Sequence, residues 1–451
     1  MTEQKELIKR ILIIALPMII SQGADTLILF TDRFFMSQVG PEHLSATLSG
    51  GITAFAITTF PMGIAIQSTA LIAQYFGSGQ KKRCAEITLQ TFYCVLALYP
   101  IILTLACLFG PALMRSMGHS ELHTDLEIRY FNILIFAMIF PLAKTAFASF
   151  FTGIGKTGHV MAGNLISVVI NIPLSYVMIF GKFGFEARGI EGAAIATVIA
   201  QFGSCLYFII LYFSPKFNKL FQTCHSFAIH LQDIKKIFYF GTPAGIEFLL
   251  QVAAFDFFIL VFQSQGNDIA TAISITFNWD LLAFLPMVGI NAAVMTLIGQ
   301  CIGSNKIEDA KRITTLSVLL ASLYACLFIV LFLTCTNPMI DLFLNPEQAN
   351  DVVRNYASDF LKIASIYLLA DAVFLVYSGA LKGAGDNYFS MMITICVYWI
   401  KAGGTYYFVK YTDLSPQMIW AYFVFCIVTI GILFYWRYRT GQWQKIKMLK
   451  N

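Results

Sequence analysis

A phrase of eight residues occurs twice in this chain, 226 residues apart. Residues 71–78 read Leu-Ile-Ala-Gln-Tyr-Phe-Gly-Ser, and residues 297–304 read Leu-Ile-Gly-Gln-Cys-Ile-Gly-Ser. The same offset places Pro17 on Pro243, and it gives seven identities over the 24 positions that begin at residue 65. An internal repeat of this length predicts two halves with one shared fold.

The composition is that of a membrane protein. Hydrophobic residues make up 58% of the chain and charged residues 12%, against about 25% charged residues in an average soluble domain. Apolar runs of about 20 residues recur along the chain, and each is long enough to cross a bilayer. We therefore predict an all-α integral membrane protein with twelve transmembrane helices, six on each side of the polar segment 214–236. The expected spans are 11–36, 45–76, 86–110, 128–153, 160–181, 190–213, 237–263, 269–302, 313–336, 358–380, 388–409 and 417–436.

Lysine and arginine residues are divided unequally between the two sets of loops. Of the 30, we count 20 in loops on the side of the N-terminus, seven on the opposite side and three inside spans. Cytoplasmic loops carry the excess of positive charge, so we expect both termini and the segment 214–236 in the cytoplasm. This bias also accounts for the net charge of +5, and the sequence gives no indication of a nucleic-acid partner.

Each half begins and ends on the same side of the membrane, because it has an even number of spans. The halves therefore point the same way, and a pseudo-twofold axis along the membrane normal relates them. We expect an N-terminal six-helix lobe at 1–213, a cytoplasmic linker at 214–236, and a C-terminal six-helix lobe with a cytoplasmic tail at 237–451. Duplicated halves are typical of transporters that work by alternating access, with the substrate between the bundles.

Ionisable residues inside the spans are the candidate functional residues, because each costs about 2.5–3.5 kcal/mol to place in the membrane. Asp371 is the strongest candidate: it lies in the middle of a span, without a basic residue within one helical turn. Such a carboxylate is suited to take up and release a proton. Glu247 and Gln251 are four residues apart and share one helix face, whereas Asp256 lies on the other side of that helix.

The first span carries two further acids, Asp25 and Asp32, seven residues apart and hence on one helix face. Asp32 is either a site residue or the partner of Arg33 in a structural ion pair. Asp25 is either a site residue or a structural residue. Lys144 could neutralise either acid, while Asp280 and Lys401 have no assigned role. Four asparagines in the spans either bond across helices or ligate a cation through their carbonyl oxygens: Asn164, Asn171, Asn278 and Asn291.

In their order and spacing these features resemble the multidrug and toxic compound extrusion (MATE) family, and its NorM branch more than its DinF branch. The resemblance covers nearly the whole chain. It is carried by Pro17 and Thr31-Asp32-Arg33-Phe34-Phe35-Met36, the two Gln-x-x-Gly phrases at Gln74 and Gln300, Gly153-Ile154-Gly155-Lys156-Thr157, Asn171-Ile172-Pro173-Leu174 and Asp371-Ala372-Val373.

The resemblance implies two six-helix bundles of the MATE/MOP type, and a monomeric antiporter in the inner (plasma) membrane. It implies export of amphipathic, mostly cationic small molecules in exchange for Na⁺ or H⁺, with no other cofactor. Asp32 matches the acidic residue of the family's first helix, Asn171 the asparagine of its fifth, and Asp371 the acidic residue of its tenth. Na⁺ is then expected at Glu247 and Asp371, beside Gln251.

Two positions depart from the family pattern. Four residues after Asn171, the DinF branch has an aspartate and NorM relatives often have an asparagine, but this chain has Ser175. The NorM glutamate of the seventh helix aligns with Gln251, and Glu247 stands one turn earlier. The identity of the coupling ion therefore stays open.

Three other classes are alternatives. A flippase for lipid-linked saccharides has a related two-lobed architecture, but its cavity is often rich in Arg and Lys. Here the acids expected to be buried outnumber the buried bases by six to three. The six acids are Asp25, Asp32, Glu247, Asp256, Asp280 and Asp371. A membrane hydrolase would need a paired nucleophile and base or a metal site. The six histidines fall in or near loops and the ten cysteines form no Cys-x-x-Cys pair, so we expect neither an enzyme nor a metal site built from histidine or cysteine. A passive channel would have no evident need of two rocking halves.

Overall fold

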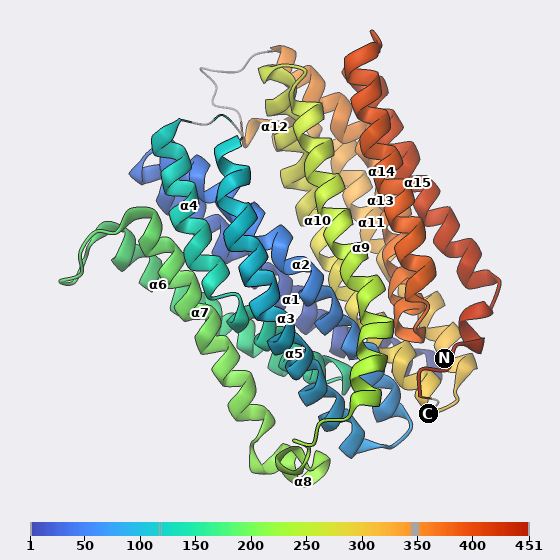
Figure 1. Cartoon of the computed structure of the whole chain (residues 1–451). Coiled ribbons are helices and arrows are strands. Elements are labelled where there is room, and N and C mark those ends of the chain that lie inside the picture. Colours follow the sequence, from blue (N-terminus) through green and yellow to red (C-terminus); the bar gives the residue numbers. More distant parts are fainter. Residues whose placement is uncertain (1, 117, 119, 344–350, 450–451) are drawn as a thin grey trace. The chain divides into compact units, whose positions relative to one another are not determined.

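The structure is a computed structural model that describes residues 2–116, 118, 120–343 and 351–449. These residues form long α-helices joined by short loops, and no strand occurs among them (Figure 1). The helices are α1 (Thr2–Val39), α2 (Pro41–Gly77), α3 (Lys81–Ser116), α4 (Glu121–Phe136), α5 (Ile139–Gly153), α6 (Thr157–Phe180), α7 (Gly189–Tyr212), α8 (Pro215–Phe221), α9 (Leu231–Gln263), α10 (Asn267–Gly303), α11 (Ile307–Thr334), α12 (Thr336–Asp341), α13 (Asp351–Ala384), α14 (Asn387–Tyr411) and α15 (Pro416–Arg439), with 3₁₀ turns at Thr223–His225 and Gln442–Lys445.

Every expected span lies on one of these helices or on a pair of them. Within the described residues, ten helices are long and apolar enough to cross a membrane, and the pair α4 and α5 makes an eleventh span. The remaining expected span is α14, which is less apolar and carries Lys401 near its middle. The all-helical membrane fold predicted from the sequence is therefore confirmed.

The fourth expected span is not one straight helix. It is broken between Phe136 and Ile139, and its two parts are bent by 43°. Pro141 explains the break, because proline has no N–H to donate and its ring clashes with the carbonyl four residues earlier, at Ala137. The freed carbonyl of Ala137 is satisfied locally, since it accepts from the N–H of Phe140 at 3.0 Å.

The chain divides into two compact units, and two of the boundaries between them fall inside the long helices α1 and α9. Unit 1 contains the start of α1 up to Ile19, residues 250–302 and residues 306–447. Unit 2 contains residues 20–249, the turn Gly303–Asn305 and the chain from Met448 onward. The start of α1 thus packs with the second half of the sequence, and the start of α9 with the first. The lobe boundaries expected from the sequence stay a prediction.

Hydrogen bonds and an ion pair join the linker 214–236 to α3 within unit 2. The side chain of Gln90 bridges it, donating to the carbonyl of Ala228 at 2.8 Å and accepting from the N–H of His230 at 3.1 Å. Arg83 forms an ion pair of 2.7 Å with Asp233, at the start of α9. These contacts explain why the first turns of α9 belong to unit 2.

Gly303, from the second copy of the repeated phrase, packs against Gln74 of the first copy, and both residues belong to unit 2. A Cβ atom at Gly303 would overlap the backbone carbonyl of Gln74, so any larger residue at position 303 would displace that backbone. The amide of Gln74 also donates to the sulfur of Met448 at 3.0 Å. The glycine of one copy is therefore needed for close packing against the glutamine of the other.

Aromatic side chains dominate the core of unit 1. Trp420 and Phe423 of α15 stack at 4.6 Å between ring centroids, with the ring planes 3° apart. Phe258 of α9 lies 4.7 Å from Phe423, and the indole N–H of Trp420 donates to the carbonyl of Phe360 at 3.0 Å. This cluster fixes α9, α13 and α15 around the middle of α14.

Candidate functional site

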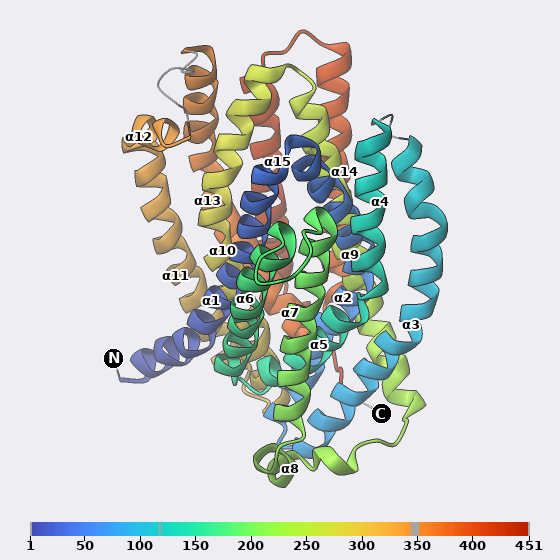
Figure 2. The same ribbon diagram turned by 90° about the vertical axis from the view of Figure 1, so that its left-hand side faces the viewer.

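Asp32 is held by two hydroxyl groups inside unit 2. Its side chain is 4% exposed. Ser175 of α6 donates to Oδ1 at 2.9 Å, and Thr197 of α7 donates to Oδ2 at 3.1 Å. Helices α6 and α7 run side by side in both views (Figures 1 and 2), so hydroxyl groups from the two reach one carboxylate.

Asn171 completes this cluster with a carbonyl oxygen that has no partner in the described part of the chain. Its Nδ2 donates to the hydroxyl oxygen of Thr197 at 3.2 Å, while its fully buried Oδ1 accepts no hydrogen bond. A buried polar atom without a partner is costly. Carboxylate, hydroxyl and carbonyl oxygens are the ligands that hard cations prefer, so the cluster is suited to a small cation or a proton.

The alternative in which Asp32 forms an ion pair with Arg33 is wrong. The side chain of Arg33 is exposed, and the ion pairs of the described residues do not include these two. Adjacent residues on a helix point about 100° apart, so they do not face each other. Within the part of the chain that the structure describes, the Asp32 carboxylate therefore has no cationic partner within 4 Å.

Asp25 has a different environment from Asp32. Its Oδ2 accepts from Asn164 at 3.2 Å, and its Oδ1 lies 3.8 Å from the ammonium of Lys144, as the sequence suggested. Lys144 also donates to Gln201 of α7 at 3.3 Å. Asp25 is thus a half-buried acid with a fixed basic neighbour, and its role as a site residue stays a prediction.

Asp371 lies on α13 in unit 1 and is 8% exposed. Within the described residues its carboxylate has no hydrogen bond and no ion pair shorter than 4 Å. Its charged neighbours are Asp280 of α10 and Lys401 of α14, both of which interact with it electrostatically. The sequence named both residues but could not place them beside Asp371, because all three come from different helices.

Tyr367 of α13 contacts Asp280 and lies on the same helix face as Asp371. Its hydroxyl donates to Oδ1 of Asp280 at 2.6 Å. Tyr367 precedes Asp371 by four residues, so the two side chains share one face of α13. This face of α13 therefore presents a tyrosine and an aspartate to the half-buried Asp280.

The three residues expected at the C-terminal site do not all belong to one unit. Gln251 is in unit 1 with Asp371, and its amide donates to the hydroxyl of Tyr398 at 3.0 Å. Glu247, one turn earlier on α9, is 1% exposed and belongs to unit 2. The expected Na⁺ position at Glu247 and Asp371 stays a prediction.

The remaining two of the four asparagines, Asn278 and Asn291, lie in unit 1 and make ordinary hydrogen bonds. Asn291 donates to the carbonyl of Leu375 at 2.6 Å, which joins α10 to α13, and Asn278 donates to the carbonyl of Ser274 in its own helix at 2.8 Å. Both contacts fit the structural role that the sequence allowed.

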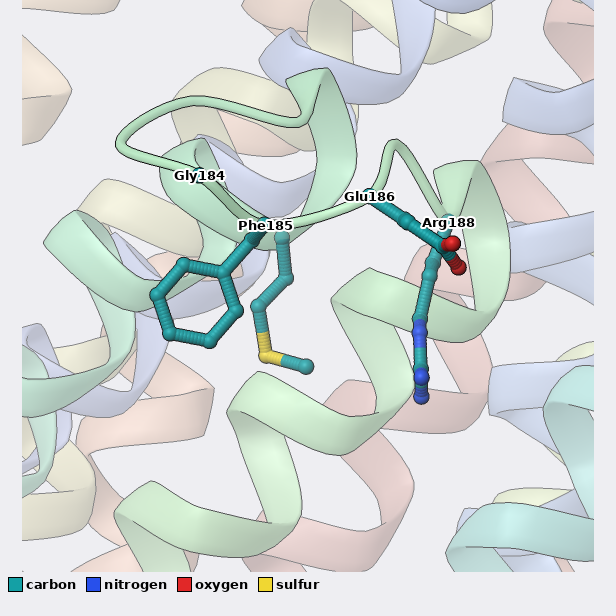
Figure 3. Close-up of a pocket in the computed structure, with 5 residues that line it drawn as sticks. Gly184, Phe185, Glu186 and Arg188 are labelled. Atoms are coloured by element: carbon teal, nitrogen blue, oxygen red, sulfur yellow. The ribbon is translucent and has the colours of Figure 1, made fainter.

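One hollow of the surface contains none of the predicted site residues. It has a volume of about 350 Å³ and lies at the loop between α6 and α7 (Figure 3). Its lining consists of Met178, Gly184, Phe185, Glu186 and Arg188. Among the described residues, no three His, Cys, Asp or Glu side chains are grouped so that they could hold a metal ion.

Thr197→Val is expected to destabilise unit 2. The valine keeps the shape of the side chain but removes the hydroxyl that donates to Asp32 and accepts from Asn171. Losing a hydrogen bond to a buried charged group costs about 1.5–3 kcal/mol. Thermal unfolding of the purified protein measures the loss. Thr31→Val is the matched control, because the Thr31 hydroxyl bonds only to the carbonyl of Leu27 in its own helix; equal effects of the two changes would contradict the assignment.

The chain matches the MatE family model over residues 17–177 and 243–407, one match in each half. It is 25% identical over 438 residues to a probable multidrug resistance protein NorM of Mannheimia succiniciproducens, covering 95% of this chain and 93% of that protein. A protein of the same description from Oceanobacillus iheyensis is 28% identical over 425 residues, covering 93% of each chain. Among solved structures, a crystal structure of MATE in complex with MaD3S superimposes with a TM-score of 0.86 at 21% identity, covering 97% of each chain.

Proposed function

Because the chain belongs to the MatE family, we propose that it is a secondary active multidrug efflux antiporter. It exports amphipathic, mostly cationic compounds in exchange for Na⁺ or H⁺ by alternating access. The names of its relatives, which are multidrug resistance proteins, support the export of small molecules. The positive charge in the loops supports a protein of the inner membrane with both termini in the cytoplasm, and we expect it to act as a monomer.

The environment of Asp32 is the main observation that supports the exchange of a cation. A buried carboxylate that receives hydrogen bonds from two hydroxyl groups and also interacts with Asn171 has neutral partners but no cationic one within 4 Å among the described residues. An ionised group inside the membrane is expensive and normally functional. An exchangeable cation removes this cost when it binds, and Asp371 of unit 1 offers a second carboxylate of the same kind.

Coupling follows from competition for these carboxylates. A ligand shifts the equilibrium between two conformations only by the difference between its affinities for them. The coupling ion enters from outside, binds the acids and favours the conformation that releases the exported compound. The compound then binds from the cytoplasm after the ion has left.

Buried charges favour this function over a flippase for lipid-linked saccharides. A cavity for a pyrophosphate group would be lined by arginine and lysine. Among the described residues, buried acids outnumber buried lysine and arginine residues by seven to two. Three of these acids pair with arginine, namely Glu86 and Asp233 with Arg83, and Asp386 with Arg437. The other four are Asp32, Glu127, Glu247 and Asp371, and the two buried bases are Lys144 and Lys401.

The test is the extrusion of a fluorescent cationic dye from proteoliposomes against its concentration gradient. An inward Na⁺ gradient at fixed pH and an inward proton gradient without Na⁺ are applied separately. We expect one of the two gradients to drive the dye uphill, and the responding gradient identifies the ion. Movement of the dye only down its own gradient would indicate a channel and contradict the proposal.

A further inference from the structure

Lys401 is a buried lysine surrounded by aromatic rings. It lies near the middle of α14 and is 1% exposed. Its ammonium nitrogen is 4.1 Å from the ring centroid of Tyr398, 4.5 Å from Phe423, 5.4 Å from Phe258 and 5.6 Å from Phe255. Among the described residues, no carboxylate lies within 4 Å of it.

The four rings explain how a charged lysine is kept inside unit 1. An ammonium group over the face of an aromatic ring is attracted by the ring's quadrupole, and cages of several rings are the usual way in which proteins bind alkylammonium ions. The titratable groups that act on Lys401 are Asp280, Asp371 and Cys426, together with Tyr398, whose ring it contacts. The lysine is therefore the one basic group described in an otherwise acidic neighbourhood.

The cage also sets the distance between the lysine and the acids. If Lys401 paired directly with Asp371, the ammonium would occupy the position that an exchangeable cation needs. Held by the rings, it is too far away for an ion pair but near enough to act electrostatically on Asp280 and Asp371. The carboxylates therefore stay open while their total charge is reduced.

We propose that Lys401 sets the charge of this acidic group so that it takes up one monovalent cation, Na⁺ or H⁺, instead of two. Two carboxylates and one ammonium group carry a net charge of −1, which a single monovalent cation neutralises. Without the lysine the net charge is −2. This inference rests on the proposed exchange of a cation, and it makes Lys401 a positioning residue that acts through the acids.

The experiment counts the cations that the purified protein binds, in an Asp32→Asn background that removes the contribution of unit 2. Equilibrium binding of radioactive Na⁺ at fixed pH gives the number of sodium ions, and proton release in unbuffered solution gives the number of protons. With Lys401 present we expect one cation per protein in total. With Lys401→Met we expect a second cation, or binding of the first about tenfold tighter, because a nearby positive charge has been removed.

Two further variants separate the effect of charge from damage to the fold. Lys401→Arg keeps the charge over the rings and should restore one cation per protein. Lys362→Met removes a positive charge from the exposed surface of α13 and should change nothing. If Lys401→Met unfolds, adding Asp280→Asn returns the net charge to −1 and should restore both folding and a single bound cation.

Equal cation number and affinity with and without Lys401 would overturn the inference, and so would a failure of Lys401→Arg to restore them. Dye extrusion is measured with the same Lys401 variants in protein that keeps Asp32, and it reports on the proposed function separately. Ion-driven extrusion that does not respond to Lys401→Met contradicts only the role of Lys401. If Lys401→Met adds a second cation but the protein with both Asp32 and Lys401 drives no extrusion, the role of Lys401 is supported and the antiporter is contradicted.

Discussion

Asp371→Asn is expected to reduce ion-driven extrusion to the background of empty liposomes. The change keeps the size of the side chain and removes its charge, and no hydrogen bond of the described residues depends on that carboxylate. The coupling ion then loses its ligand in unit 1. Losing an interaction with a charged group costs about 1.5–3 kcal/mol, or about 10- to 100-fold in affinity for the ion. Initial rates of dye extrusion at several ion concentrations measure the effect.

Asp359→Asn is the matched control for this prediction. Asp359 lies on the same helix, three turns earlier, and accepts a hydrogen bond of 3.1 Å from Gln417 of α15. Asparagine can keep that bond through its carbonyl oxygen, so we expect extrusion at the wild-type rate. Wild-type extrusion by Asp371→Asn as well would remove Asp371 from the coupling site.

The fold was predictable because membrane spans depend on local composition. A run of about 20 apolar residues is enough to identify a span, so each expected span falls on a helix. The break between α4 and α5 could have been anticipated from Pro141, which lies inside an expected span. The assignment of the start of α1 to unit 1, and of the start of α9 to unit 2, depends on packing between distant segments, which composition does not encode.

The charged residues of the sites were predictable, but their partners were not. Asp32 and Asp371 stand out in the sequence because acids are expensive in the membrane. The sequence does not single out Thr197, because a threonine inside a span is common. Only the structure, in which α7 packs beside Asp32, shows that Thr197 donates to it. Lys401 was visible as a charge, but the rings around it come from three helices.

The duplicated scaffold gives the two units different chemistry at equivalent positions. At the offset of 226 residues, the place of Asp32 in the first half is taken by Phe258 in the second. Phe258 is one of the rings that surround Lys401. An acid in one half thus corresponds to one of the rings around a lysine in the other, so at this position the scaffold repeats and the ionisable residue does not.

Asp32→Asn is expected to abolish ion-driven extrusion while the protein stays folded. The amide keeps the shape of the side chain and can still accept from Ser175, but it gives up the negative charge that attracts the ion. Because a buried charge without a fixed partner is itself costly, the variant should unfold at the wild-type temperature or above it. A site that binds its ion at 100 times the dissociation constant adds about 2.7 kcal/mol of stability, and the contribution of the site in unit 2 should disappear in the variant, while that of unit 1 remains.

Asp25→Asn should behave in the opposite way. The change removes the fixed partner of Lys144, which is 9% exposed, and leaves that ammonium without its neighbouring charge. We therefore expect a lower unfolding temperature, with the stabilisation by the coupling ion retained. Thermal unfolding of both variants across a series of ion concentrations separates the two roles. If Asp32→Asn lost stability and Asp25→Asn lost the response to the ion, the binding site of unit 2 would lie at Asp25, and the hydroxyl groups around Asp32 would serve the fold.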